Sequence, residues 1–234
     1  ALLIILTVCK FLQAQNVGIG TTTPVARLQV TDSSVLFSAG GNILAIPGNP
    51  PIEGPGRRMM WYADKAAFRA GYTLGNAWDK VNTGIYSFAT GFNTIASGGI
   101  STAIGSQTTA SGNNSFASGL NTTASSIAST AMGSNTNASG SSSTAMGNIT
   151  TASGAASTAM GWSTTAAGSS STAMGRFTIA SGDYSTAMGR QTFARGDYST
   201  AMGNFTSTSG ENSTAMGRLT NASGENSTAM GKYT

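Results

Sequence analysis

Small and apolar residues recur with a period of 14 residues along the second part of the chain. Ten units run from Ile85 to Gly224, and a shorter one runs from Glu225 to Thr234. The third residue of a unit is always Ser, the fifth Ala, the seventh Gly and the tenth Thr. The twelfth is Ala except at Thr208, and the fourteenth is Gly except at Ser126. This repeat predicts stacked, nearly identical coils, and its stop in mid-unit leads us to expect a longer natural chain.

Each unit consists of two similar halves of seven residues, in which Ser or Thr, Ala and Gly alternate with variable positions. A heptad also suggests a coiled coil, but two Gly per unit and the scarcity of Leu, Glu and Lys exclude one. Alternation instead predicts a strand of about five residues in each half, with Gly where the chain turns. Two strands and two turns then close a coil. We therefore predict an all-β parallel roll, or solenoid, whose coils are spaced about 4.8 Å apart.

The same alternation assigns the side chains of each unit to faces. Positions three, five and seven, with ten, twelve and fourteen, are small and are predicted to fill the interior. Positions four and six face the other way and are Thr and Met from the fourth unit onward. A roll filled by Ala, Ser and Gly buries little apolar surface, at roughly 25 cal/mol per Å². We therefore predict that copies of the chain dock through this Met seam, which also keeps it from solvent. The predicted seam residues are Met132, Met146, Met160, Met174, Met188, Met202, Met216 and Met230.

The second half of each unit has a freely varying face that is predicted to be exposed to solvent. Aromatic residues and arginines gather there and at the adjacent turn in the seventh to ninth units. This is the composition of a binding hot spot, so we predict a ligand face. Two plainer interpretations remain: scattered surface residues, or aromatic rings that shield the coil edge. The candidate ligand-face residues are Phe177, Ile179, Phe193, Arg195, Phe205, Arg176 and Arg190.

The first 14 residues are typical of the end of a secretory signal peptide. The apolar run Ala1–Val8 is too short to span a bilayer, and Ala14 fits the last residue of a cleaved leader. A lipoprotein that begins at Cys9 is the alternative, although Val8 stands where a small residue is expected. We therefore expect a secreted protein whose mature form contains no cysteine.

The composition changes twice more before the repeats begin. Residues 15–38 hold short β-prone runs, including Val35–Phe37, and are predicted to form an N-terminal segment of short strands. Residues 39–84 begin as a Pro/Gly linker and continue as a short connector. Within it, Met59–Lys80 has a helical pattern, with strand as the alternative. The repeats then occupy residues 85–234.

The composition excludes most enzyme chemistry. The chain has no His and a single Cys, Cys9, so histidine acid–base catalysis, Cys/His nucleophiles and His/Cys metal sites are ruled out in the mature chain. Cu(I) bound by the Met column is another interpretation, but neither His nor Cys accompanies it. Charged residues make up 9% and the net charge is +4, which is too little for a nucleic-acid-binding stripe. We therefore predict no enzyme, no metal, no cofactor and no nucleic-acid partner.

The few charges of the repeats are confined to one end. Residues 85–175 contain no charged residue at all. Beyond them, unit position one becomes acidic and position eight becomes basic. Such columns keep the surface soluble or join neighbouring subunits by weak surface pairs. The acidic column is Asp183, Asp197, Glu211 and Glu225, and the basic column is Arg176, Arg190, Arg218 and Lys232.

The Ser-Thr-Ala-Met-Gly halves followed by Ala-Ser-Gly halves resemble the YadA-like head repeat of trimeric autotransporter adhesins. The resemblance covers residues 85–234, with Thr and Met where the family pattern has Val and Ile. It implies a left-handed parallel β-roll, a homotrimer and display outside the bacterial outer membrane. Residues 16–24 and 61–65 resemble secreted Bacteroidetes head-repeat proteins, many of which end in a self-cleaving chaperone. We expect either that chaperone or a membrane anchor downstream.

Several functions are compatible with this sequence. The leading hypothesis is an adhesin or fibre head that attaches to a host or matrix protein or glycan. The Thr columns at positions four and ten suggest ice or crystal-surface binding as an alternative, although regular Thr-any-Thr pairs are lacking. A fibre spacer without a ligand of its own is another. A glycoside hydrolase would need two carboxylates across a cleft, which nothing in the sequence indicates.

Overall fold

The structure is a computed structural model that describes residues 17–19, 21–22 and 26–234. It divides into two compact units, Ala1–Gly40 and Gly41–Thr234. The expected signal peptide, residues 1–14, lies outside the described residues. In the first unit β1 (Val17–Ile19) pairs in parallel with β2 (Leu28–Val30). The strand predicted at Val35–Phe37 is wrong: these exposed residues have no strand beside them among the described residues, and an unpaired strand is not stable alone.

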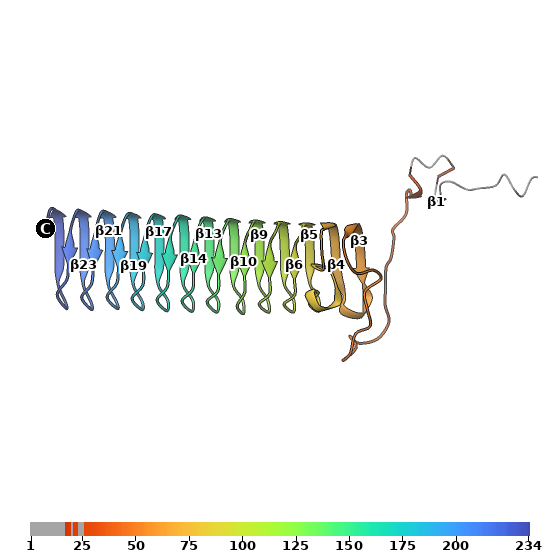
Figure 1. Ribbon diagram of the computed structural model, residues 1–234, viewed down its shortest axis with the longest axis horizontal. Coiled ribbons are helices and arrows are strands. Elements are labelled where there is room, and N and C mark those ends of the chain that lie inside the picture. The colour runs from red at the N-terminus through yellow and green to blue at the C-terminus, as the bar shows by residue number, and fades with distance from the viewer. Residues whose placement is uncertain (1–16, 20, 23–25) are drawn as a thin grey trace, which may run out of the picture. The chain divides into compact units, whose positions relative to one another are not determined.

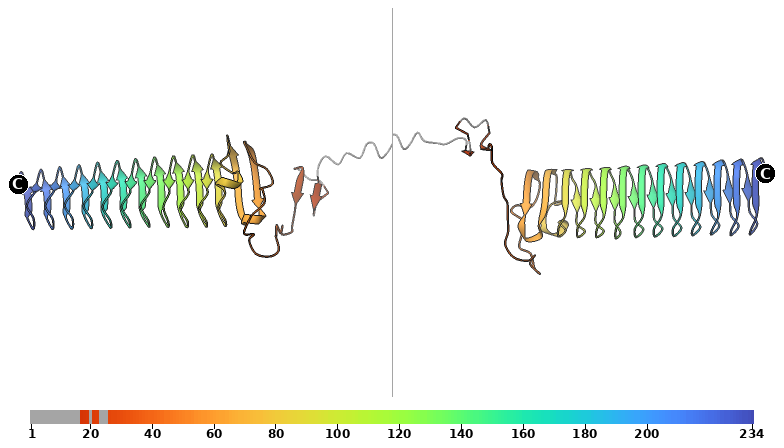
Figure 2. Two further views of the ribbon diagram at one scale, coloured as in Figure 1. Left: turned by 60° about the horizontal axis from the view of Figure 1, so that its bottom comes forward. Right: turned by 180° about the vertical axis from the view of Figure 1, so that it is seen from behind.

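The second unit is the predicted all-β parallel solenoid, with one coil per 14-residue sequence unit (Figures 1 and 2). Positions four to eight of each unit form the long strands, which join the 13-stranded sheet. These are β5 (Phe88–Phe92), β7 (Thr102–Ser106), β9 (Phe116–Leu120), β11 (Thr130–Ser134), β13 (Thr144–Asn148), β15 (Thr158–Trp162), β17 (Thr172–Arg176), β19 (Thr186–Arg190), β21 (Thr200–Asn204), β23 (Thr214–Arg218) and β25 (Thr228–Lys232).

The second half of each unit forms a much shorter strand than predicted. Only positions eleven and twelve pair with the neighbouring coils, in the ten-stranded sheet. The remaining residues are used by the two turns, which leave little extended backbone between them. The short strands are β6 (Ile95–Ala96), β8 (Thr109–Ala110), β10 (Thr123–Ala124), β12 (Asn137–Ala138), β14 (Thr151–Ala152), β16 (Thr165–Ala166), β18 (Ile179–Ala180), β20 (Phe193–Ala194), β22 (Ser207–Thr208) and β24 (Asn221–Ala222).

Small side chains fill the interior of the roll, as predicted for positions three, five, ten, twelve and fourteen. The alanines at positions five and twelve form one continuous buried cluster from Ala89 to Ala201. In several units the Ser at position three donates its hydroxyl to the Gly carbonyl that ends the preceding unit, as from Ser115 Oγ to Gly112 O at 2.6 Å. Thr208 replaces Ala at position twelve, and its hydroxyl hydrogen-bonds to Ser199 Oγ at 2.9 Å. The interior therefore accepts only small residues, although several buried hydroxyl groups, such as those of Ser143 and Thr164, have no hydrogen-bond partner there.

The glycines at position seven do not lie inside the roll, contrary to the prediction. They are half-buried or exposed, with φ near +120°, as at Gly161. A β-carbon added to Gly161 would lie 2.1 Å from the carbonyl oxygen of Gly175 in the next coil. Glycine is required here both for its backbone conformation and for close contact between coils.

The left-handed positions in the two turns of each coil are occupied by residues other than glycine. Positions two and nine have φ between +49° and +61°, including the β-branched Ile100 and Ile149. This left-handed region is unfavourable for such residues. Each coil supports the next there, as where the Phe177 N–H donates to Trp162 O at 3.0 Å. Stacking therefore imposes a conformation that the turn sequences alone do not favour.

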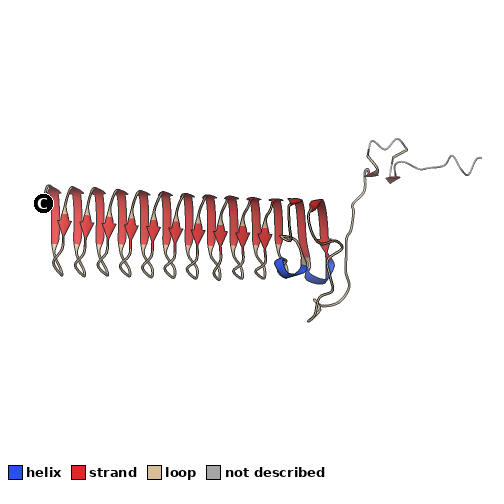
Figure 3. Cartoon of the chain, in the orientation of Figure 1, coloured by secondary structure: helices blue, strands red, loops and turns tan. Residues whose placement is uncertain are grey.

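A hairpin cap covers the first coil (Figure 3). β3 (Gly56–Tyr62) pairs antiparallel with β4 (Ala67–Thr73), and β4 pairs in parallel with β5. The helical pattern predicted for Met59–Lys80 is thus wrong: it contains these strands and two 3-10 turns, η1 (Ala63–Lys65) and η2 (Lys80–Asn82). Trp78 and its neighbours form a second buried cluster under the hairpin. Within the described residues, no helix has the length and apolar character needed to cross a bilayer.

Arg69 of the cap stands in line with the interior alanines, opposite Ala89. Its fully buried guanidinium donates to Ser87 O at 3.0 Å, Ser87 Oγ at 2.7 Å and Ala96 O at 3.1 Å. Burial lowers the pKa of Arg69 to about 10, which leaves it charged at neutral pH. Arg69 thus closes the end of the interior and satisfies carbonyls of the first coil.

We expect Arg69→Ala to destabilise the cap by about 2 kcal/mol, because it leaves a void and unpaired carbonyl groups. Thermal and urea unfolding of the variant measure this loss. The exposed Arg57 on β3 supplies the matched control, since Arg57→Ala should change stability by less than about 0.5 kcal/mol. Equal effects of the two substitutions would contradict a structural role for Arg69.

Candidate assembly face and ligand groove

The predicted Met seam is one continuous column on the outer face of the 13-stranded sheet. Parallel pairing places each Met opposite the next in register, from Met132 on β11 to Met230 on β25. The Thr residues at position four form a second column on the same face, beginning at Thr130. We call these two columns the Thr/Met face.

The Thr/Met face is not covered by the chain itself. Met132 is 38% exposed and Met230, in the last coil, is 61% exposed, while the six methionines between them are half-buried by their neighbours. Flexible thioether side chains adapt well to an apolar partner. The face is therefore a long, flat apolar surface of the kind that marks a contact site.

The candidate ligand-face residues fall into two groups. Phe177, Ile179 and Phe193 come together and, with Ser163, Thr165 and Gln191, line an open groove of about 360 Å³. Arg195 lies beside the groove, with its guanidinium 4.6 Å from the Phe193 ring centroid. Its Nη1 also donates to Ser207 Oγ at 2.9 Å. We call this first group the outer groove.

The second group lies on the turn that follows the long strands. Arg190 stacks over Phe205 at 5.7 Å, and Arg176 stacks over Trp162 at 4.4 Å. Arg176 also lies 5.2 Å from the ring of Phe177, which borders the groove. Trp162 was not among the predicted residues, although it occupies position eight one unit before Arg176 and the period alone places the two side by side.

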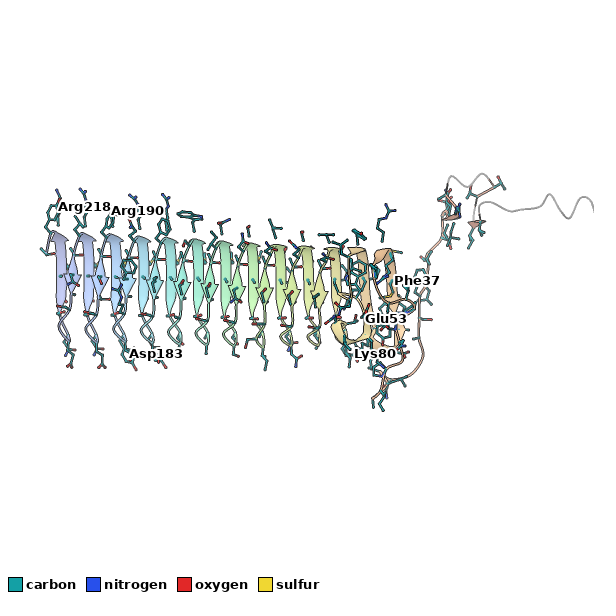
Figure 4. The ribbon with its side chains drawn as sticks, viewed as in Figure 1. Phe37, Glu53, Lys80, Asp183, Arg190 and Arg218 are labelled. Atoms are coloured by element: carbon teal, nitrogen blue, oxygen red, sulfur yellow. The ribbon has the colours of Figure 1, made fainter. Side chains whose placement is uncertain are left out.

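The acidic and basic columns lie at opposite edges of the roll. In Figure 4, Arg190 and Arg218 project from one edge and Asp183 from the other. We call the turns with Arg176, Arg190, Arg218 and Lys232 the basic edge, and those with Asp183, Asp197, Glu211 and Glu225 the acidic edge.

The carboxylates of the acidic edge also support the turns. Asp183 Oδ1 accepts the Ser169 N–H at 2.7 Å, and Asp197 Oδ1 accepts the Asp183 N–H at 2.8 Å. Asn113 makes the same contact with the Gly99 N–H, so the bond does not need a charge. Directly after the two aspartates in the sequence, Tyr184 and Tyr198 stack with ring centroids 5.0 Å apart and remain more than half exposed. The sequence prediction missed this tyrosine pair, which the 14-residue spacing brings together.

The two Thr columns do not form a common surface. Threonines at position ten, such as Thr164 and Thr178, are fully buried inside the roll, whereas those at position four are on the Thr/Met face. A flat array for ice binding needs both columns on one exposed face, so the geometry does not favour that function. Among the described residues, no three His, Cys, Asp or Glu side chains are grouped so as to hold a metal ion.

Comparison with known families agrees with the repeat and its fold. The YadA head domain repeat, in its two-copy form, matches residues 96–122, 124–148, 152–178, 180–206 and 209–234. No curated protein matches the chain. The matched segments cover more than half of the chain and coincide with the coils of the solenoid. The chain therefore belongs to the family of YadA head domain repeats.

Proposed function

We propose that this protein is the head of a trimeric adhesin, secreted or displayed on the bacterial surface. Three copies pack through the Thr/Met face, and the outer groove attaches the head to a host or matrix glycan or protein. The family supports the adhesin-like role and the number of chains.

The observation that carries this proposal is the separation of the two surfaces. The Thr/Met face belongs to the 13-stranded sheet, whereas Ile179 and Phe193 of the outer groove belong to the ten-stranded sheet. Packing three copies through the first sheet leaves the second sheet pointing outward. Each head would then present three grooves, which raises the strength of attachment to a surface through multivalency.

The outer groove has the chemistry of a recognition site. Phe177 and Phe193 supply apolar ring surface, Gln191 and Thr165 supply hydrogen-bonding groups, and Arg195 supplies a charge. Ring faces with a few polar groups suit the mixed apolar and hydroxylated surface of a sugar or a peptide. Because Arg195 is stacked on Phe193, the site loses little side-chain entropy on binding.

We expect the triple variant Phe177→Ser, Phe193→Ser, Arg195→Ser to reduce attachment by at least about tenfold, because it removes the aromatic anchors and the charge. Beads that carry the chain are counted on cultured epithelial cells under flow. Serine already occupies each of these unit positions, at Ser163, Ser207 and Ser209, so the variant should fold and assemble normally.

Leu219→Ser with Asn221→Ser provides the matched control, since these residues occupy the same unit positions away from the groove. The control should retain full attachment. Full attachment by a folded triple variant would move the ligand site to other coils or to the N-terminal segment. Absence of attachment by the wild-type chain to cells and matrix-coated surfaces would instead favour a spacer without a ligand.

A further inference from the structure

Within one chain, the side chains of the acidic and basic edges contact neutral groups rather than each other. The arginines of the basic edge stack on aromatic rings, and the aspartates of the acidic edge accept backbone N–H groups. The two edges face away from each other across the coil (Figure 4). The charges therefore meet no opposite charge across the roll, although the two columns begin within one coil of each other and only the basic one is interrupted, at Asn204.

The two edges are complementary to each other in a side-by-side arrangement. A rotation axis parallel to the roll carries each chain onto its neighbour, so unlike edges meet at every contact. All copies then lie at the same height along the axis. The acidic edge occupies the eighth to eleventh units and the basic edge the seventh, eighth, tenth and eleventh, so opposite charges share the eighth, tenth and eleventh units.

An antiparallel arrangement does not match in this way. It would place the charged coils of one copy beside residues 85–175 of the other, which contain no charged residue. Because the rest of the repeat region is uncharged, the charged coils of two copies can face each other only when the copies are parallel. Such charge complementarity determines how two copies are oriented more than how tightly they bind.

Aromatic residues on both edges strengthen the match. The exposed Tyr184 and Tyr198 rings stack on each other, and each directly follows a carboxylate residue of the acidic edge. Arg176 and Arg190, held over Trp162 and Phe205, lie on the basic edge and precede Tyr184 and Tyr198 by about half a coil. Guanidinium groups bind both carboxylates and tyrosine ring faces. The acidic edge thus offers these arginines two kinds of partner, carboxylates and tyrosine rings.

We propose that the acidic edge of each copy binds the basic edge of the next copy, and that this contact sets the parallel orientation and the register of the assembled head. This inference rests on the proposed assembly through the Thr/Met face and assigns a separate function to the edges. The partner is a second copy of this chain, recognised by Asp and Glu carboxylates, tyrosine rings and arginine guanidinium groups.

Charge reversal on the full chain tests the proposal. One variant carries Arg190→Glu and Arg218→Glu, a second carries Asp197→Lys and Glu211→Lys, and a third combines all four changes. Each double variant should raise the concentration at half-assembly roughly tenfold, because like charges then face each other at every contact. The fourfold variant should return to within about threefold of the wild type, because its edges are again complementary. Sedimentation velocity over a concentration series measures all four chains.

Two controls separate the loss of charge pairing from damage to the turn that Asp197 supports. The fourfold variant has also lost the Asp197 contact with the Asp183 N–H, so its recovery cannot come from a repaired turn. Asp197→Asn with Glu211→Gln removes the charges and keeps an amide acceptor, as Asn113 does. This variant should assemble with a weaker dependence on salt than the wild type.

The possible results separate the two proposals. A wild-type chain that assembles, with reversals that have no effect or a fourfold variant that stays as weak as the double variants, would overturn the edge contact alone. A wild-type chain that stays monomeric would overturn the proposed assembly and the edge contact together.

Discussion

Replacing Met174, Met188 and Met202 together by Asp should separate the chains of the proposed assembly. The three side chains are neighbours in one column on the Thr/Met face, half-buried by their own coils and open on the outer side. In an assembly they would be fully buried, and three carboxylates per chain cannot be desolvated there without partners. We expect the dissociation constant to rise by at least about a hundredfold.

Sedimentation equilibrium and circular dichroism distinguish dissociation from unfolding in this variant. Because the methionines lie outside the roll, the separated chains should keep part of their β-structure. Ser181→Asp, Ser209→Asp and Ser223→Asp form the matched control, since these exposed serines occupy position thirteen, away from the Thr/Met face. An unchanged assembly in the Met variant would show that another face packs at the axis.

Gly161→Ala should destabilise the solenoid by about 3 kcal/mol or more. The added β-carbon would lie 2.1 Å from the carbonyl oxygen of Gly175, and φ at this position is +120°, so strain and overlap act together. The oxygen belongs to the backbone of the next coil and cannot rotate away. Relief of the overlap therefore requires the two coils to separate and lose ladder hydrogen bonds.

Thermal unfolding and hydrogen exchange across β15 and β17 measure this effect. Gly75→Ala is the matched control, because no atom lies within 4 Å of a β-carbon there and φ is not in the left-handed region. The control should change stability by less than about 1 kcal/mol. A Gly161 variant as stable as the Gly75 variant would contradict the role assigned to position seven.

The repeat period was sufficient to predict the solenoid, its small interior and the Met column. Each of these follows from alternation within a strand and from identical spacing between units, which act at every coil. Once Met132 and Met146 share a unit position, stacking alone brings them together. The proximity of Ile179 and Phe193 was predictable for the same reason, since they are one unit apart.

Features that depend on contacts between coils or with the cap, rather than on local residue preferences, were not predictable. The left-handed turns accept Ile149, Phe177 and Asn121 alike, so no residue type marks them, and stacking rather than local preference imposes them. The cap lacks the repeat, and its hairpin joins an antiparallel pair to a parallel sheet. Nothing in the local pattern around Arg69 indicates that it continues a column of alanines.

Sedimentation equilibrium of the wild-type chain at micromolar concentration tests the central claim most directly, which is that copies of the roll pack side by side through the Thr/Met face. The proposed head predicts a particle of three chain masses, with the elongated hydrodynamic shape expected of parallel rolls. A particle of one chain mass at that concentration, with a folded circular dichroism spectrum, would contradict the claim.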